Sequence, residues 1–189
     1  MIPVIDIFAG PGGLGEGFSS FSDEHGSAAF KIKLSLEKEE HAHRTLQLRA
    51  FYRQFAKSRV PEDYYKCLRG EITLEELYKR HPDEAKAAEA EAVRLTLGED
   101  TWDESEALIT KALNGAKEWV LIGGHPVKPI RSRGRARNKG IEGYEAKQDH
   151  RHFLYREYLK ILGTFHPSVF VMENVKGLLS SKPRRLLYF

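Results

Sequence analysis

The fold is decided near the start of the chain, by the stretch Ile2-Pro3-Val4-Ile5-Asp6-Ile7-Phe8-Ala9-Gly10-Pro11-Gly12-Gly13-Leu14-Gly15-Glu16-Gly17-Phe18. An apolar run of strand type leads there into a glycine-rich turn, and the residues after the turn can begin a helix. Glycines permit positive φ angles and let backbone N–H groups approach a ligand closely. The N-terminus of the helix adds partial positive charge and unpaired donors. Such a strand–turn–helix unit is typical of nucleotide-binding α/β domains; the alternative is a tight turn that binds no ligand.

Length and composition are those of a globular domain. The chain has 189 residues, of which 41% are hydrophobic and 30% are charged, and this is enough to bury the core of one domain. The sequence contains no apolar run as long as a membrane span. Its N-terminus lacks the basic and apolar regions of a signal peptide. We therefore expect a cytoplasmic protein with no membrane partner.

Cysteine content and net charge bear on which bonds, metal sites and partners the chain can have. Cys67 is the only cysteine, so an intrachain disulfide and a cysteine-rich zinc site are excluded, and we expect no metal site. A lone, partly apolar cysteine is expected to fill space in the core and not to act as a nucleophile. The net charge of +3 permits a nucleic-acid partner without requiring one.

A second strand is predicted over Phe30–Glu37, after a first helix over residues 14–21. Apolar and polar residues alternate along this strand, which ends in the acid Glu37. In a Rossmann-like unit, an acid at the end of the second strand accepts hydrogen bonds from ribose hydroxyls. The alternative is a solvated surface glutamate. Residues 39–55 then repeat apolar positions at helical spacing, which predicts the second helix.

The middle of the chain is rich in charge and in alanine. Residues 58–69 show no clear period. The segment Thr73-Leu74-Glu75-Glu76 is typical of a helix start, and residues 85–97 and 104–113 predict two further helices. We interpret residues 73–117 as an insertion of helices beside the sheet, whose charges face solvent.

The last part of the chain returns to strands. Residues 119–122 form a short apolar run that predicts a buried strand, and residues 149–165 have the pattern of an amphipathic helix. Residues 169–172 predict another apolar strand, which leads directly into Glu173-Asn174-Val175.

The glycine-rich stretch resembles a known motif almost letter for letter. Residues 6–18 are similar to the first motif of the DNA cytosine-5 methyltransferases, which binds the methionine end of S-adenosylmethionine (SAM). Gly70-Glu71-Ile72 resembles the third motif, a segment after the third strand whose acid meets the adenine; a chance match is the alternative. The resemblance implies that SAM is the cofactor and methyl donor. The implied cofactor-binding residues are Asp6, Phe8, Ala9, Gly10, Gly12, Gly13, Leu14, Glu37 (at the ribose) and Glu71.

Glu173-Asn174-Val175 resembles a second motif of the same family. There the glutamate hydrogen-bonds N3 and the amino group of a cytosine that has been flipped out of the duplex. The chemistry needs this contact, because C5 is a poor nucleophile until a thiolate adds to C6, and the acid stabilises the charge moved onto N3. The resemblance thus implies catalytic roles at Glu173 and Asn174. Residues 149–159 are similar to the family's fifth motif.

The nucleophile motif departs from the family pattern. The family has Gly-Gly-Pro-Pro-Cys-Gln, whereas this chain has Gly123-Gly124-His125-Pro126-Val127-Lys128. Val127 takes the place of the cysteine and cannot add to C6. Reading the codons of residues 125–133 one base early can encode Ser-Cys-Gln-Ala-Tyr-Ser-Leu-Ala, which is the family's motif in order. Our hypothesis is a pair of compensating single-base shifts there, with a comparable shift over residues 183–189; divergence to a pseudoenzyme is the alternative.

The resemblance implies a partial catalytic domain over residues 1–189. Its expected fold is Rossmann-like α/β, with a mostly parallel sheet, helices on both faces and an incomplete C-terminus without the target-recognition domain. The implied activity is SAM-dependent methylation of cytosine C5 in double-stranded DNA, of restriction–modification type. As written, the chain is expected to be inactive. Arg135 and Arg137 are candidate DNA contacts, and a solvated basic loop is the alternative.

Two alternative hypotheses about the chain do not make it an enzyme. One is a non-catalytic SAM-binding subunit that pairs with a second chain supplying the missing C-terminal half. The other is a gene remnant whose exposed apolar edge makes it insoluble. The sequence does not indicate which DNA site is recognised.

Overall fold

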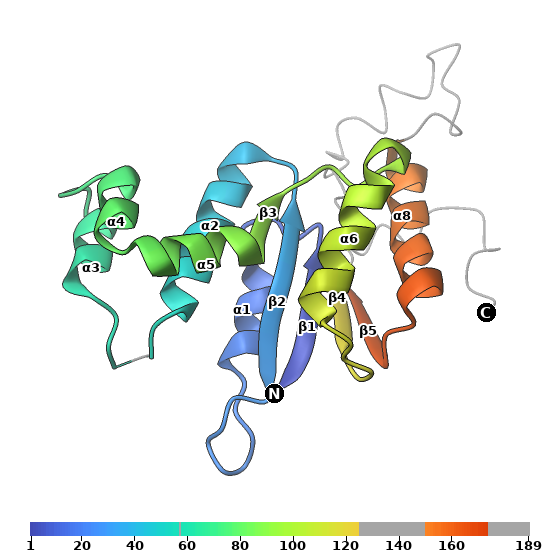
Figure 1. The fold of residues 1–189 in the computed structure, drawn as a ribbon, viewed down its shortest axis with the longest axis horizontal. Helices are drawn as coiled ribbons and strands as arrows, with labels where there is room; N and C mark the ends of the chain where they lie inside the picture. The colour runs from blue at the N-terminus through green and yellow to red at the C-terminus, as the bar shows by residue number, and fades with distance from the viewer. Residues whose placement is uncertain (57, 125–149, 174–189) are drawn as a thin grey trace, which may run out of the picture.

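A computed structural model of the protein describes residues 1–56, 58–124 and 150–173. Helices connect the successive strands along the chain, and four of them, α2 to α5, follow one another between β2 and β3 (Figure 1). In order they are β1 (Ile2–Ile7), α1 (Gly13–Ser20), β2 (Phe30–Glu37), α2 (Glu40–Arg53), α3 (Glu62–Leu68), α4 (Leu74–Arg80), α5 (Pro82–Glu91), β3 (Ala92–Arg94), the 3-10 turn η1 (Glu99–Thr101), α6 (Trp102–Leu113), β4 (Val120–Gly124), α8 (His150–Phe165) and β5 (Val169–Glu173).

The five strands form one sheet in the order β3-β2-β1-β4-β5, and every neighbouring pair is parallel. The chain runs outward from β1 to β3 on one side and then returns to build β4 and β5 on the other. The strand order therefore reverses between β1 and β4, where a Rossmann-like sheet opens its ligand-binding edge. The predicted α/β fold with a parallel sheet is confirmed.

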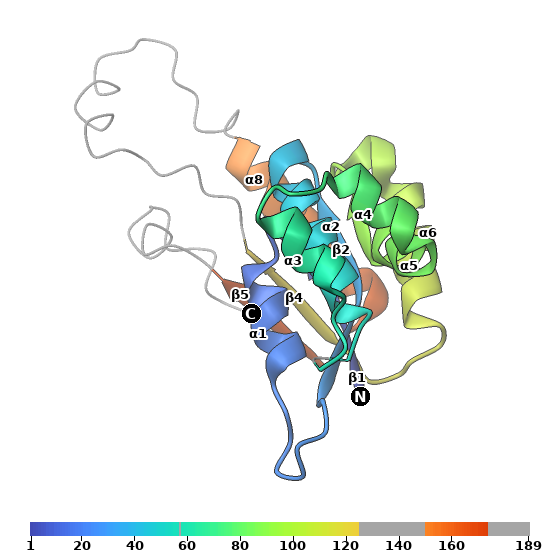
Figure 2. The same cartoon turned by 90° about the vertical axis from the view of Figure 1, so that its left-hand side faces the viewer.

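Helices cover both faces of this sheet (Figures 1 and 2). On one face, Val4, Ile32 and Ile122 pack against Leu14 and Phe18 of α1. On the other face, strand residues such as Ile5 and Leu121 pack in one cluster with α6 and α8. This cluster is the largest described part of the core, and it includes Ile7, Leu34, Leu36, Ile109, Leu113, Tyr158 and Ile161.

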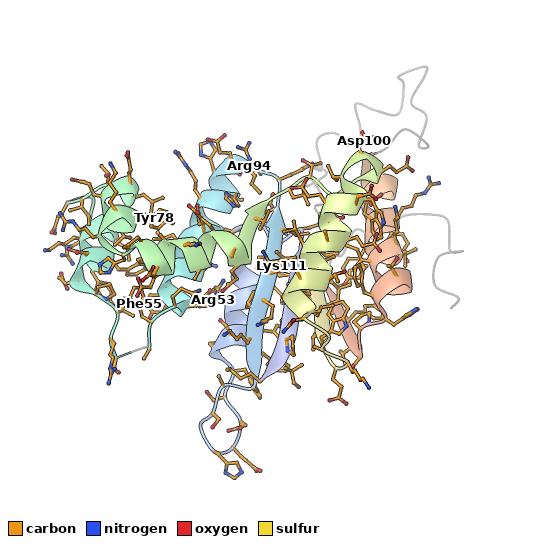
Figure 3. All side chains as sticks on the ribbon, viewed as in Figure 1. Arg53, Phe55, Tyr78, Arg94, Asp100 and Lys111 are labelled. Carbon is orange, nitrogen blue, oxygen red and sulfur yellow. The ribbon has the colours of Figure 1, made fainter. Side chains whose placement is uncertain are left out.

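A separate apolar cluster joins α2 to the helices that follow it. Phe51 is fully buried there and stacks on Tyr64 of α3, with ring centroids 6.5 Å apart. Leu77 of α4 and Ala88 of α5 complete the cluster. In Figure 1, α3 and α4 lie beyond α2, on the side of the sheet away from β4 and β5. Tyr78 and Phe55 mark this helical part in Figure 3.

Two predictions for the middle of the chain are wrong. The helix expected over residues 85–97 ends at Glu91, and Ala92–Arg94 instead forms β3, paired with Ser35–Glu37 of β2. Pairing along the edge of β2 outweighs the helix propensity of the alanine-rich run. Residues 73–117 are therefore more than a helical insertion, because they contribute a strand and the covering helix α6. Residues 58–69, left without an assignment, contain α3.

Other local predictions are confirmed closely. β2 spans Phe30–Glu37 as expected. The predicted start of α4 is a capping box, in which the Thr73 hydroxyl accepts from the Glu76 N–H and the Glu76 carboxylate accepts from the Thr73 N–H. Within the described ranges, no helix is long and apolar enough to cross a membrane.

Candidate functional site

The glycine turn between β1 and α1 has a backbone that few residues other than glycine adopt. Gly10 and Gly12 have φ angles of 57° and 87°, and Phe8 has a φ angle of 54°. A Cβ atom added to Gly12 would lie 2.8 Å from Cδ1 of Leu46 in α2. The turn thus passes close to α2 and delivers the chain into α1, whose first N–H groups have no acceptor within the helix. These donors suit an anionic group.

Glu37 ties the glycine turn to the end of β2. The Gly10 N–H donates to Oε2 of Glu37 at 2.7 Å, and the Glu39 N–H donates to Oε1 at 2.7 Å. Only 9% of Glu37 is exposed, so the alternative of a solvated surface glutamate is wrong. Each carboxylate oxygen accepts one backbone hydrogen bond and retains capacity for another.

Asp6 lies directly behind this turn, in the second half of β1. It is fully buried, and neither carboxyl oxygen has a hydrogen-bond partner in the described part of the chain. A Cβ atom added to Gly15 would lie 3.0 Å from Oδ2, so the first turn of α1 sits on the carboxyl group. Burial raises the pKa of Asp6 to about 8; the charge of Arg53 opposes this shift and that of Glu37 adds to it. Near neutral pH, Asp6 is therefore mostly protonated.

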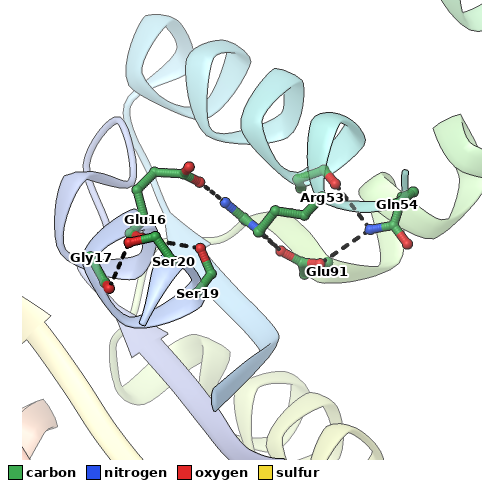
Figure 4. Close-up of polar contacts among 8 residues, drawn as sticks. Glu16, Gly17, Ser19, Ser20, Arg53, Gln54 and Glu91 are labelled. Atoms are coloured by element: carbon green, nitrogen blue, oxygen red, sulfur yellow. Dashed lines mark hydrogen bonds and ion pairs between the residues drawn. The ribbon is translucent and has the colours of Figure 1, made fainter. Parts of the chain in front are cut away.

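Arg53, the last residue of α2, joins three helices around the turn (Figure 4). Its guanidinium pairs with Glu16 of α1 and with Glu91 of α5, where Nε donates to Oε1 at 3.0 Å. Gln54 Nε2 donates to the other oxygen of Glu91 at 3.3 Å. Burial raises the pKa of Glu91, and Arg53 and Gln54 counteract that effect. The network fixes α1 against α2 and fixes the residue just before β3.

Next to β1, where the strand order of the sheet reverses, β4 ends in two glycines. A Cβ atom added to Gly123 would lie 2.4 Å from the Ile7 carbonyl oxygen, so β1 and β4 approach too closely there for any side chain. Gly124 pairs with Glu173 at the end of β5, and a Cβ atom added to Gly124 would lie 3.2 Å from Oε2 of Glu173. Glu173 is exposed at the carboxyl edge of the sheet. Its carboxylate thus lies beside the end of β4.

Comparison with known proteins identifies the family of this chain. The family model for C-5 cytosine-specific DNA methylases matches residues 91–188, about half of the chain. The chain belongs to the C-5 cytosine-specific DNA methylase family. This match confirms the expected resemblance to the family.

A bacterial methyltransferase is similar to nearly the whole chain. The chain is 30% identical over 196 residues to the type II methyltransferase M.Bpa9945I of Bacillus paralicheniformis. The aligned part covers 95% of this chain and 42% of the relative, so the chain spans less than half the length of that methylase. A comparison with solved structures finds no match.

The structure brings most of the predicted cofactor residues of the chain together. The residues of the glycine turn and Glu37 meet at the carboxyl ends of β1 and β2, and Glu173 lies at the end of β5. Val127, Arg135, Arg137 and Asn174 lie outside the described residues. The gathered residues are Asp6, Phe8, Ala9, Gly10, Gly12, Gly13, Leu14 and Glu37.

The placement of Gly70-Glu71-Ile72 after a third strand is wrong. These residues follow α3, and exposed Glu71 pairs with Arg69 on the helical part of the molecule. The third strand is β3, and Glu99 and Asp100 follow it as exposed carboxylates in η1. Figure 3 shows Asp100 at the top of α6. β3 was not predicted from the sequence because it has only three residues and directly follows an alanine-rich helix. The run Leu95-Thr96-Leu97-Gly98 after it was the one local indication of a strand end.

Sequence reasoning also missed the Arg53 network. Arg53, Glu16 and Glu91 carry no motif, and their burial results only from the packing of three helices. The burial of Asp6 was likewise not apparent from the motif that contains it.

Proposed function

We propose that the chain binds SAM at the glycine turn and belongs to a restriction–modification enzyme that methylates cytosine C5 in DNA. The observation that supports this most is the junction of the glycine turn with β2, where the Gly10 N–H meets Glu37. This junction stands at the carboxyl edge of a parallel sheet, which is where Rossmann-like proteins bind nucleotides. Membership of the cytosine methylase family makes SAM, an adenosine derivative, the ligand to propose.

The residues present fit the chemical groups of this cofactor. The free N–H groups at the start of α1 suit the methionine carboxylate. The unused acceptor capacity of Glu37 suits the ribose hydroxyls. Buried Asp6, without a partner in the described part of the chain, offers a carboxyl group that could face the methionine ammonium and sulfonium. When bound, SAM supplies an electrophilic methyl group to the target carbon.

We assign the cytosine contact to Glu173. A carboxyl group at the carboxyl edge of β5 can hydrogen-bond N3 and the amino group of a base that has left the duplex. Its neighbour in the sheet, Gly124, has no side chain that could cover the carboxylate. Asn174 is retained as a proposed catalytic residue, and Arg135 and Arg137 are retained as proposed DNA contacts.

A second candidate function follows from Val127, which stands where the family has its cysteine nucleophile. A valine cannot form the bond to cytosine C6, so we propose that the chain as written does not methylate DNA. It would then act as a SAM-binding, non-catalytic subunit beside a second chain. Val169 and Phe170 of β5 are each 54% exposed and are compatible with such a partner.

Sequencing the coding DNA across codons 120–190 separates these functions. Bases that restore Cys-Gln at residues 127–128 would support an ordinary methylase. If the sequence stands, transfer of labelled methyl groups from SAM to DNA should be undetectable for the chain as written. Methyl transfer by the valine-containing chain would contradict the proposed role of a thiol, and failure to bind SAM would contradict both candidate functions.

A further inference from the structure

Asp6 is a carboxyl group with an unusual environment next to the proposed cofactor site. It is fully buried, and in the described part of the chain neither of its oxygens has a hydrogen-bond partner. It lies two residues before Phe8, where the glycine turn begins, and α1 covers it closely at Gly15. A buried polar group without a partner costs free energy, so the folded chain keeps Asp6 there at the expense of stability.

The charged groups around Asp6 come from each element packed near it. β2 contributes Glu37, α1 contributes Glu16, and α2 contributes Arg53, whose charge acts on Asp6. Arg49 of α2 reaches the turn at Gly12, where its Cδ would lie 3.7 Å from an added Cβ. From the other face, Tyr158 of α8 has its pKa raised by burial and by Asp6. β4 contributes no titratable side chain.

Arg53 already forms ion pairs with two other carboxylates. It pairs with both Glu16 and Glu91, and within residues 1–56, 58–124 and 150–173 neither oxygen of Asp6 accepts a hydrogen bond from it. Asp6 therefore lacks a counter-ion of its own while the site is empty, and the neutral acid is favoured. A cation that enters the glycine turn would supply this counter-ion.

We propose that SAM binding is coupled to the loss of a proton from Asp6, whose carboxylate becomes the counter-ion of the cofactor. The inference rests on the proposed function, because it takes SAM as the ligand of the glycine turn. SAM carries a sulfonium and an ammonium group against one carboxylate. S-adenosylhomocysteine, the product of methyl transfer, lacks the sulfonium charge and should displace the proton less.

The direction of the pH dependence follows from linkage. Below the pKa of Asp6, which is about 8 in the free protein, a proton must leave when SAM binds. The affinity for SAM therefore rises as the pH rises towards 8, by at most about tenfold per pH unit, and levels off above it. At pH 8 the protein would bind SAM more tightly than S-adenosylhomocysteine, which lacks the sulfonium charge. This difference in affinity would favour release of the product.

The test is calorimetry of SAM binding at pH 7 in two buffers with different enthalpies of ionisation. The wild-type protein should release up to one proton on binding SAM and clearly less on binding S-adenosylhomocysteine. Both ligands carry the same amino group, so the difference between them isolates the sulfonium charge. The D6N variant should still bind SAM and should release no proton, whereas E71Q should behave like the wild type.

The outcomes separate the two proposals. SAM binding without proton release, or equal release with S-adenosylhomocysteine, would overturn the coupling and leave the proposed function standing. Unchanged proton release by D6N would also overturn the coupling. Absence of SAM binding by the wild type between pH 6 and 9 would overturn both proposals. If D6N does not fold, the difference in proton release between SAM and S-adenosylhomocysteine on the wild-type protein is sufficient to test the coupling.

Discussion

The backbone N–H of Gly10 donates a 2.7 Å hydrogen bond to the carboxylate of Glu37, twenty-seven residues later in the chain. This bond joins the turn after β1 to the end of β2 at the carboxyl edge of the sheet. It places a glycine turn, a helix N-terminus and an acid in one site. The predictions below test this site and the packing that holds it.

Replacing Glu37 by Gln should weaken SAM binding about tenfold or more. The amide can accept only at its oxygen, so one of the two backbone bonds is lost together with the charge that strengthens the other. Equilibrium titration with SAM measures the effect. The matched control is Glu71→Gln on the exposed helical part, whose affinity should equal that of the wild type. Equal losses in both variants would contradict the assignment of Glu37.

Replacing Asp6 by Asn should remove a pH dependence of stability. The pKa of this carboxyl group is about 3.9 in the unfolded chain and about 8 in the folded chain. The folded state holds the extra proton between these values, so the free energy of unfolding falls as pH rises, by at most about 1.4 kcal/mol per unit. Urea unfolding at pH 5 and pH 8 should show a smaller difference for Asp6→Asn than for the wild type. The exposed change Asp83→Asn should leave that difference unaltered.

Replacing Arg53 by Gln should cost about 2–4 kcal/mol of stability. The change leaves Glu91, whose side chain is only 11% exposed, without its cation. Because Glu16 is 35% exposed, water screens part of the effect on that side. The double variant Arg53→Gln, Glu91→Gln should recover much of the loss, since no buried charge then lacks a partner. No recovery in the double variant would show that packing, and not charge, explains the loss.

Replacing Gly123 by Ala should destabilise the sheet by about 3 kcal/mol. The added methyl group would stand 2.4 Å from the Ile7 carbonyl oxygen, and neither strand can move away without breaking the pairing of β1 with β4. Gly17→Ala in α1 is the control, because nothing lies within 4 Å of its added Cβ. That change should raise stability by about 0.5–1 kcal/mol. Thermal unfolding of both variants checks the contrast.

The sequence predicted the parts of the fold that local patterns determine. β2, β4 and β5 were predicted within two residues, and β1 was predicted as the apolar run before the glycine turn, because each is an apolar or alternating run bounded by turn residues. The glycine turn and Glu37 could be placed in one site because the ends of neighbouring parallel strands meet.

The parts that sequence reasoning missed depend on tertiary contacts. Ala92–Arg94 becomes a strand only because β2 offers it an edge. Glu71 matched a three-residue pattern but lies on the helical part, where Arg69 pairs with it. The burial of Asp6 and the Arg53 network arise from the way α1, α2 and α5 pack, which no local spacing encodes.

The most direct test of the account is to titrate the isotopically labelled protein with SAM and follow its backbone amide resonances by NMR. Binding at the glycine turn predicts saturable, one-to-one shifts of the amides of Gly10, Gly13, Leu14 and Gly15, while the amides of Glu71 and its neighbours stay in place. Absence of saturable shifts, or shifts centred on α3 and α4, would contradict the central claim that the glycine turn and Glu37 hold the cofactor.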